Sequence, residues 1–200
     1  MAISHNRGTA LHCACESNNE DLVQMLLDEG NPVDCRDYSG CTPLFTAVRA
    51  GSSNNILTLL VQRGAEVDAL GSFGSYTPLA IAAGMGDIRM VTFLAGVGAN
   101  LNVSPVDANG ETPLHLAAMN GATAVTCFLL AAGCWPGVRD KEGKTPLSYA
   151  CSLGREGTVS ALLSGEGWAL PHVPQGAKTM VALQSALAQS AEAIDTWIWC

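Results

Sequence analysis

Apolar and polar positions along this chain repeat with a long period. The segment "TPLHLAAMNG" at 112–121 has close copies at 42–51, 77–86 and 145–154, and a looser copy, "TALHCACESN", at 9–18. The threonines that open the five copies are separated by 33, 35, 35 and 33 residues. A fixed period of this length is typical of a solenoid, in which each unit buries its apolar side chains against its neighbours.

Within each copy the residues predict two short helices joined by a turn. Thr followed by Pro begins the first helix, because Thr caps unpaired N–H groups and Pro fits the first helical position. A Gly nine residues after the Thr ends that helix, since Gly adopts the left-handed conformation with little strain. Apolar residues at helical spacing then predict a second helix over 21–30, 56–64, 88–98 and 124–133.

These residues resemble the ankyrin repeat. The match rests on the T-P-L-H-x-A pattern from Thr112 to Ala117 and on the Gly nine residues after the Thr. It also rests on apolar endings such as 59–65, "LLVQRGA", and on D-x-x-G-x-T before the first helix, as at 37–42. The resemblance implies an all-α solenoid of stacked helix-turn-helix units with projecting β-turns.

The resemblance covers residues 4–168, which places a repeat domain at 1–168. The expected repeats span about 4–36, 37–69, 70–106, 107–139 and 140–168.

Residues 169–200 depart from the repeat pattern. Two prolines interrupt it, and beyond Lys178 apolar residues such as Met180, Leu183 and Leu187 recur at helical spacing. We predict a proline-containing linker and then an amphipathic helix over about 178–198. The helix is expected to cap the end of the array, and the alternative is a helix that binds a partner or a second copy.

Charge narrows the class of partner. The 200 residues carry a formal net charge of −8, and the ten basic residues are scattered along the sequence. Nucleic-acid-binding proteins need a basic stripe to displace counterions from phosphates, so no nucleic-acid partner is expected. No apolar run approaches the roughly 18 residues of a membrane helix, and the first residues do not resemble a signal peptide. The sequence therefore predicts no membrane partner and a cytoplasmic or nuclear location.

Eight cysteines raise the question of a metal site or of disulfides. They form no C-x-x-C pair, and no pair of histidines has zinc spacing. Cys15 and Cys151 occupy the position that holds Ala83 and Ala118 in other copies, so both are expected to be small buried residues. We predict no metal, no cofactor and no required disulfide.

His12 and His115 are the most plausible catalytic side chains by residue type alone. Three of the five copies replace this histidine, with Phe45, Ala80 and Ser148, which argues against a general base. The ankyrin resemblance implies instead that this His shares a hydrogen-bond network with the Thr three residues before it. Because no nucleophile elbow or phosphate-binding loop occurs, we predict no enzyme and no small-molecule substrate.

The resemblance places partner binding on the concave side of the array, at the turn tips and the exposed side of each first helix. The candidate contact residues are Tyr38, Cys41, Arg49, Phe73, Tyr76, Met85, Asn109, Glu111, Met119, Asn120, Lys141 and Lys144. Aromatic and Met side chains in otherwise solvated positions are typical of an interface centre. The alternative for Phe73 and Tyr76 is that they pack the lengthened turn before the third copy.

Two functions are compatible with this sequence. The first is a non-catalytic protein-interaction module, acting as adaptor, scaffold or inhibitor, that binds a protein segment across repeats two to four. The alternative is an ankyrin-repeat fragment or regulatory subunit of an enzyme whose catalytic part lies beyond Cys200 or on a partner.

Overall fold

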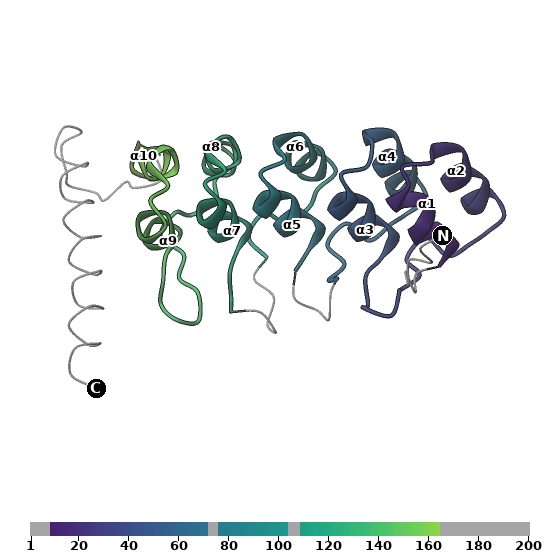
Figure 1. Cartoon of the computed structure of the whole chain (residues 1–200), viewed down its shortest axis with the longest axis horizontal. Helices are drawn as coiled ribbons and strands as arrows, with labels where there is room; N and C mark the ends of the chain where they lie inside the picture. Colours follow the sequence, from purple (N-terminus) through teal and green to yellow (C-terminus); the bar gives the residue numbers. More distant parts are fainter. Residues whose placement is uncertain (1–8, 72–75, 104–108, 165–200) are drawn as a thin grey trace, which may run out of the picture.

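The computed structural model describes residues 9–71, 76–103 and 109–164. These residues form ten α-helices in five consecutive pairs (Figure 1). The first helices of the pairs are α1 (Ala10–Glu16), α3 (Pro43–Ala50), α5 (Pro78–Met85), α7 (Pro113–Asn120) and α9 (Pro146–Ser152). The second helices are α2 (Glu20–Asp28), α4 (Asn54–Gln62), α6 (Ile88–Gly96), α8 (Thr123–Ala131) and α10 (Glu156–Ser164).

Three of the first helices, α3, α5 and α7, begin and end at the predicted residues, whereas α9 has Leu153 rather than Gly154 as its C-cap. The side chains of Thr42 and Thr77 accept hydrogen bonds from backbone N–H groups at the starts of α3 and α5, and Pro follows each Thr. Gly51 ends α3 at a φ of +74°, a conformation in which any side chain would be strained. The repeated Thr-Pro and Gly positions therefore act as helix start and stop signals.

The five pairs stack side by side into one elongated array. Figure 1 shows the first helices in one row, the second helices in a row beside it, and the turns projecting beyond the first helices. The main helix-to-helix contacts join the two members of a pair or equivalent helices of adjacent pairs. One apolar cluster runs along the array from Leu11 to Leu162 and includes Leu114, which is only 1% exposed. The predicted all-α solenoid is confirmed.

Two parts of the sequence prediction lie outside the described residues. The proline-containing linker and amphipathic helix expected over 169–200 are one, and Phe73 in the lengthened turn is the other. The ends of that turn are described, and Gly71 and Tyr76 form an isolated antiparallel bridge across it.

The two cysteines expected to be buried differ from each other. Cys15 is fully buried, and burial, with smaller contributions from Cys35 and Glu16, raises the pKa of its thiol to about 12. Cys151 is exposed, so the prediction is wrong for this residue. Its counterpart Ala118 is buried because a following helix pair covers it, whereas α9 and α10 are the last pair of the described chain.

Candidate protein-interaction surface

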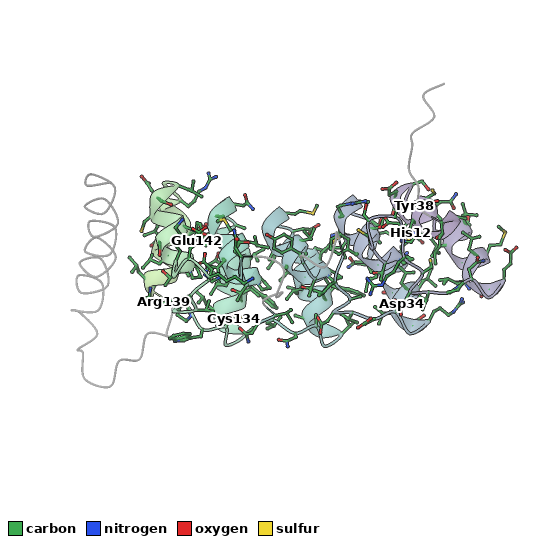
Figure 2. The ribbon with its side chains drawn as sticks, turned by 90° about the horizontal axis from the view of Figure 1, so that it is seen from below. His12, Asp34, Tyr38, Cys134, Arg139 and Glu142 are labelled. Carbon is green, nitrogen blue, oxygen red and sulfur yellow. The ribbon has the colours of Figure 1, made fainter. Side chains whose placement is uncertain are left out.

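Each turn is numbered by the helix pair that it precedes, and an aspartate fixes the shape of the second turn, at 37–41, and of the fifth turn, at 140–144. Oδ1 of Asp37 accepts hydrogen bonds from the backbone N–H groups of Ser39 and Cys41, both at 2.8 Å. Asp140 accepts the equivalent two bonds in the fifth turn, both at 2.9 Å. An Asp that bonds backbone two residues ahead stabilises a tight turn. The second turn therefore holds Tyr38, which is 77% exposed, at a defined place on the array (Figure 2).

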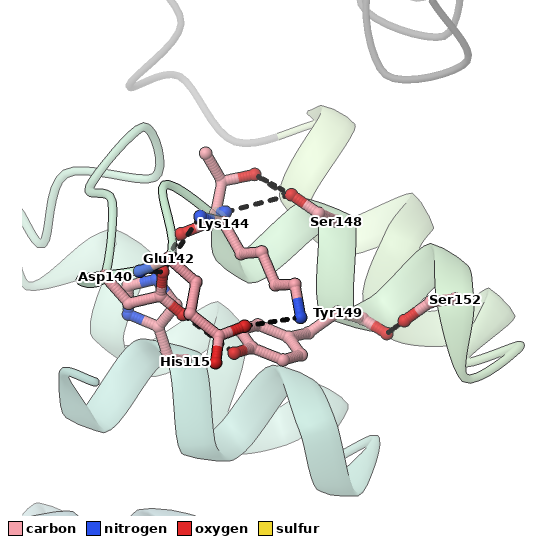
Figure 3. Close-up of polar contacts among 8 residues, drawn as sticks. His115, Asp140, Glu142, Lys144, Ser148, Tyr149 and Ser152 are labelled. Carbon is pink, nitrogen blue, oxygen red and sulfur yellow. Dashed lines mark hydrogen bonds and ion pairs between the residues drawn. The ribbon is translucent and has the colours of Figure 1, made fainter. Parts of the chain in front are cut away.

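The fifth turn is hydrogen-bonded to α9, the helix that follows it. Tyr149 on α9 donates its hydroxyl hydrogen to Oδ2 of Asp140 at 2.7 Å (Figure 3). Nζ of Lys144 lies 2.7 Å from Oε2 of Glu142 and 5.4 Å from the centroid of the Tyr149 ring. The hydrogen bond to Glu142 raises the pKa of Lys144, and burial together with the bond to Asp140 raises the pKa of Tyr149. Sequence reasoning missed Tyr149, although no other copy has an aromatic residue at this position.

Two buried histidines connect consecutive helix pairs. Nδ1 of His115 accepts a hydrogen bond from the backbone N–H of Thr112 at 3.1 Å, and its Nε2 lies 3.1 Å from the carbonyl oxygen of Lys144. His12 has an equivalent arrangement, with Nε2 2.9 Å from the carbonyl oxygen of Cys41. Burial lowers the pKa of His115, which favours the neutral ring. The structural role implied by the ankyrin resemblance is confirmed for both histidines.

The structure separates the candidate contact residues by exposure. The exposed ones are Tyr38, Arg49, Met85, Asn109, Asn120, Lys141 and Lys144, and the partly exposed ones are Tyr76 and Met119. Cys41 and Glu111 are buried, so the expectation that their side chains contact a partner is wrong. The hydroxyl group of Tyr76 donates a hydrogen bond to Oε2 of Glu111 at 2.8 Å. This contact favours the packing alternative for Tyr76.

The first helices of the third and fourth pairs form an uncharged surface. Met85 on α5 is 50% exposed, and Met119 lies on the neighbouring helix α7. A Cβ atom on Gly84 would lie 3.6 Å from both Leu116 and Asn120, so the two helices approach closely at this point. We call the exposed side of the first helices, together with the turns, the inner surface.

Within the described ranges, no three or more His, Cys, Asp or Glu residues are grouped in a way that could hold a metal ion. The seven cysteines of these ranges are free thiols. The helices described are all too short, or too polar, to cross a membrane.

Comparison with known proteins identifies the family. A family model for ankyrin repeats in three copies matches residues 2–71, 53–140 and 79–170. The B-cell lymphoma 3 protein homolog of Mus musculus is 33% identical over 156 residues, which cover 76% of this chain and 34% of that protein. The B-cell lymphoma 3 protein of Homo sapiens is 31% identical over 156 residues, with the same coverage.

A third relative is longer still. The transient receptor potential cation channel subfamily A member 1 homolog of Caenorhabditis elegans is 29% identical over 167 residues, which cover 83% of this chain and 13% of that protein. The chain thus spans about a third of the two B-cell lymphoma 3 relatives and a smaller part of the channel relative. The family model and the helix pairs lead to one conclusion: this chain belongs to the ankyrin-repeat family.

Proposed function

We propose that this chain is a non-catalytic module that binds a protein segment across the inner surface of the second to fourth helix pairs. Ankyrin repeats are protein-interaction modules, and stacked repeats present extended surfaces of this kind. The observation that carries the proposal is the exposure of Tyr38 on a hydrogen-bonded turn and of Met85 on the neighbouring row of helices.

The chemistry of these side chains suits a binding site. Tyr provides a large contact area at a small entropic cost, and the bonds made by Asp37 already restrict the turn that carries Tyr38. Met85 and Met119 are flexible side chains that adapt to the shape of a partner. Arg49, Asn109 and Asn120 supply polar groups at the rim.

The proposal extends to partner class and location. A protein partner fits better than nucleic acid, since the chain has a net charge of −8 and no basic stripe. His12 and His115 are engaged in contacts between helix pairs, which supports a non-catalytic role as adaptor, scaffold or inhibitor. We also propose that the protein acts in the cytoplasm or nucleus.

The test uses peptides selected from a random displayed library on the full chain. Their dissociation constants are then measured for the parent, Tyr38→Ala and Met85→Ala, with thermal midpoints recorded in parallel. Met25→Ala is the matched control, because Met25 on α2 is also 50% exposed but belongs to the row of second helices.

We expect Tyr38→Ala and Met85→Ala to weaken binding by roughly tenfold or more at an unchanged midpoint. Met25→Ala should bind as the parent does. Equal binding by all three variants would place the site elsewhere on the molecule.

A further inference from the structure

Charge is distributed unequally between the two sides of the array. The second helices and their cap residues carry six of the acidic side chains in the described ranges, at positions 20, 21, 28, 29, 87 and 156, and three more, at 34, 66 and 68, lie in the segments that lead from a second helix to the next turn. The turns and first helices carry five, and three of these five, Asp37, Glu111 and Asp140, are wholly or partly buried and accept hydrogen bonds from turn N–H groups or from tyrosine. Among the described residues, only Glu16 and Glu142 remain as exposed acidic groups on this side.

Basic side chains show the opposite distribution. Five of the eight in the described ranges lie on the turns and first helices, and all five are exposed: Arg36, Arg49, Arg139, Lys141 and Lys144. The side of the array that includes the inner surface therefore has an excess of exposed positive groups, although the whole chain has a net charge of −8.

The fifth turn is the most basic part of this side. Lys141 and Lys144 lie three residues apart on it, and the backbone N–H of Lys141 donates to the carbonyl oxygen of Asn109 at 2.7 Å. This bond joins the tip of the fifth turn to the fourth turn, which leads into α7, the helix that carries Met119.

A carboxylate already occupies part of this turn. Oε2 of Glu142 lies 2.7 Å from Nζ of Lys144, and both side chains are about half exposed. An exposed pair of this kind contributes little to stability. It therefore does not prevent Lys144 from exchanging its partner for a carboxylate on another molecule.

We propose that the segment bound on the inner surface is acidic, with apolar side chains over Met85 and Met119 and carboxylates at Lys141 and Lys144. This inference rests on the proposed function and extends its site to the fifth helix pair. Complementary charge at the rim of an apolar contact accelerates association and selects among partners. The acidic second-helix side repels the same segment, which restricts it to the inner surface.

The experiment compares two double variants of the full chain that change the net charge equally. Lys141→Glu with Lys144→Glu alters the fifth turn, and Arg63→Glu with Arg89→Glu alters the end of α4 and the start of α6. Peptides of twelve residues are selected from a random library on the parent, sequenced, synthesised, and measured against all three proteins at several salt concentrations.

We expect selected peptides to be enriched in Asp and Glu beside apolar residues. The fifth-turn variant should bind them at least about tenfold more weakly, with a smaller dependence on salt, and the second-helix variant should stay within about twofold of the parent. Thermal midpoints show that each variant is folded.

Three results would overturn the inference. The first is a set of selected peptides without an acidic bias. The second is equally weakened peptide binding in both double variants, which would show that only the net charge of the protein matters. Single-stranded DNA is the third case. If it bound the parent as tightly as the peptides do, and did not bind the variant with Lys141→Glu and Lys144→Glu, the surface would be a nucleic-acid-binding site. Peptides that are not acidic but still depend on Tyr38 and Met85 would leave the proposed function intact.

Discussion

The hydroxyl group of Tyr76 donates a hydrogen bond to the buried carboxyl group of Glu111 at 2.8 Å, across a separation of 35 residues. The bond connects the turn before α5 to the turn before α7. It joins the residues that immediately precede Thr77 and Thr112, the N-caps of α5 and α7, so Tyr76 acts as a connector between helix pairs.

The contribution of Tyr76 to the stability of the fold depends on pH. Burial, the hydrogen bond to Glu111 and the nearby negative charge raise the pKa of Tyr76 from 10.0 to about 12. A raised pKa in the folded state gives a stabilisation that is complete below pH 10 and is lost as the pH rises through 12. We expect Tyr76→Phe to lower the free energy of unfolding by about 1 kcal/mol at pH 8.

The measurement is urea unfolding of reduced protein between pH 8 and pH 11.5. The parent should lose stability toward high pH more steeply than Tyr76→Phe. Cys15, Cys134 and Tyr149 also have raised pKa values, and comparing the two proteins cancels their contribution. Parallel curves for the two proteins would contradict the prediction.

A second prediction concerns Gly71 at the base of the lengthened turn. A Cβ atom there would lie 2.5 Å from Cδ2 of Phe45, which is fully buried. Gly71→Ala should therefore destabilise the protein by about 1–3 kcal/mol through overpacking.

The matched control is Gly96→Ala at the end of α6. A Cβ atom at Gly96 meets nothing within 4 Å, so this change should be neutral or raise stability by up to about 1 kcal/mol through helix propensity. Thermal unfolding of both variants checks the contrast. Equal effects from the two would show that Phe45 moves aside without cost.

The periodic features of this fold could be predicted from the sequence because each depends on residues close together in the chain. Thr42 and Gly51 act on the ends of a single helix. The contact between His115 and Thr112 joins residues three positions apart. Repeated copies in the same register indicated the helix ends, and the ankyrin resemblance implied the contact between His115 and Thr112.

The errors concern features that depend on the neighbouring helix pair. Cys151 has the same local pattern as Cys15, but within the described residues no further first helix packs against α9, and Cys151 is exposed. Cys41 lies beside an exposed turn tip, yet its side chain is buried, and its backbone N–H and carbonyl groups bond Asp37 and His12. The direction of a turn side chain cannot be predicted from its position in the copy.

A third prediction follows from the environment of His115. Its Nδ1 accepts a hydrogen bond from the backbone N–H of Thr112, so protonation of Nδ1 would direct two hydrogens at each other. Burial lowers the pKa of His115 from its ordinary value of 6.5. A lowered pKa in the folded state gives a stabilisation that is present above pH 6.5 and is lost as the pH falls.

The variant that tests this is His115→Gln, because Gln three residues after a capping Thr retains the reciprocal bonds to the backbone and does not titrate. We expect the parent to lose stability between pH 7 and pH 5 and the variant to lose less. The urea midpoint at each pH provides the comparison. If the variant lost as much stability in acid as the parent, a group other than His115 would be responsible for the pH dependence.

The last prediction compares the effect on stability of truncating a buried leucine and an exposed leucine. Leu114 on α7 is 1% exposed and belongs to the continuous apolar cluster, whereas Leu153 at the end of α9 is 49% exposed. Removing three carbon atoms at Leu114 leaves a cavity between stacked pairs, so Leu114→Ala should lower the free energy of unfolding by about 2–5 kcal/mol. Leu153→Ala removes the same atoms from a solvated position and should change it by less than about 1 kcal/mol. Chemical denaturation gives both values, and similar losses for the two variants would mean that Leu153 is covered in solution.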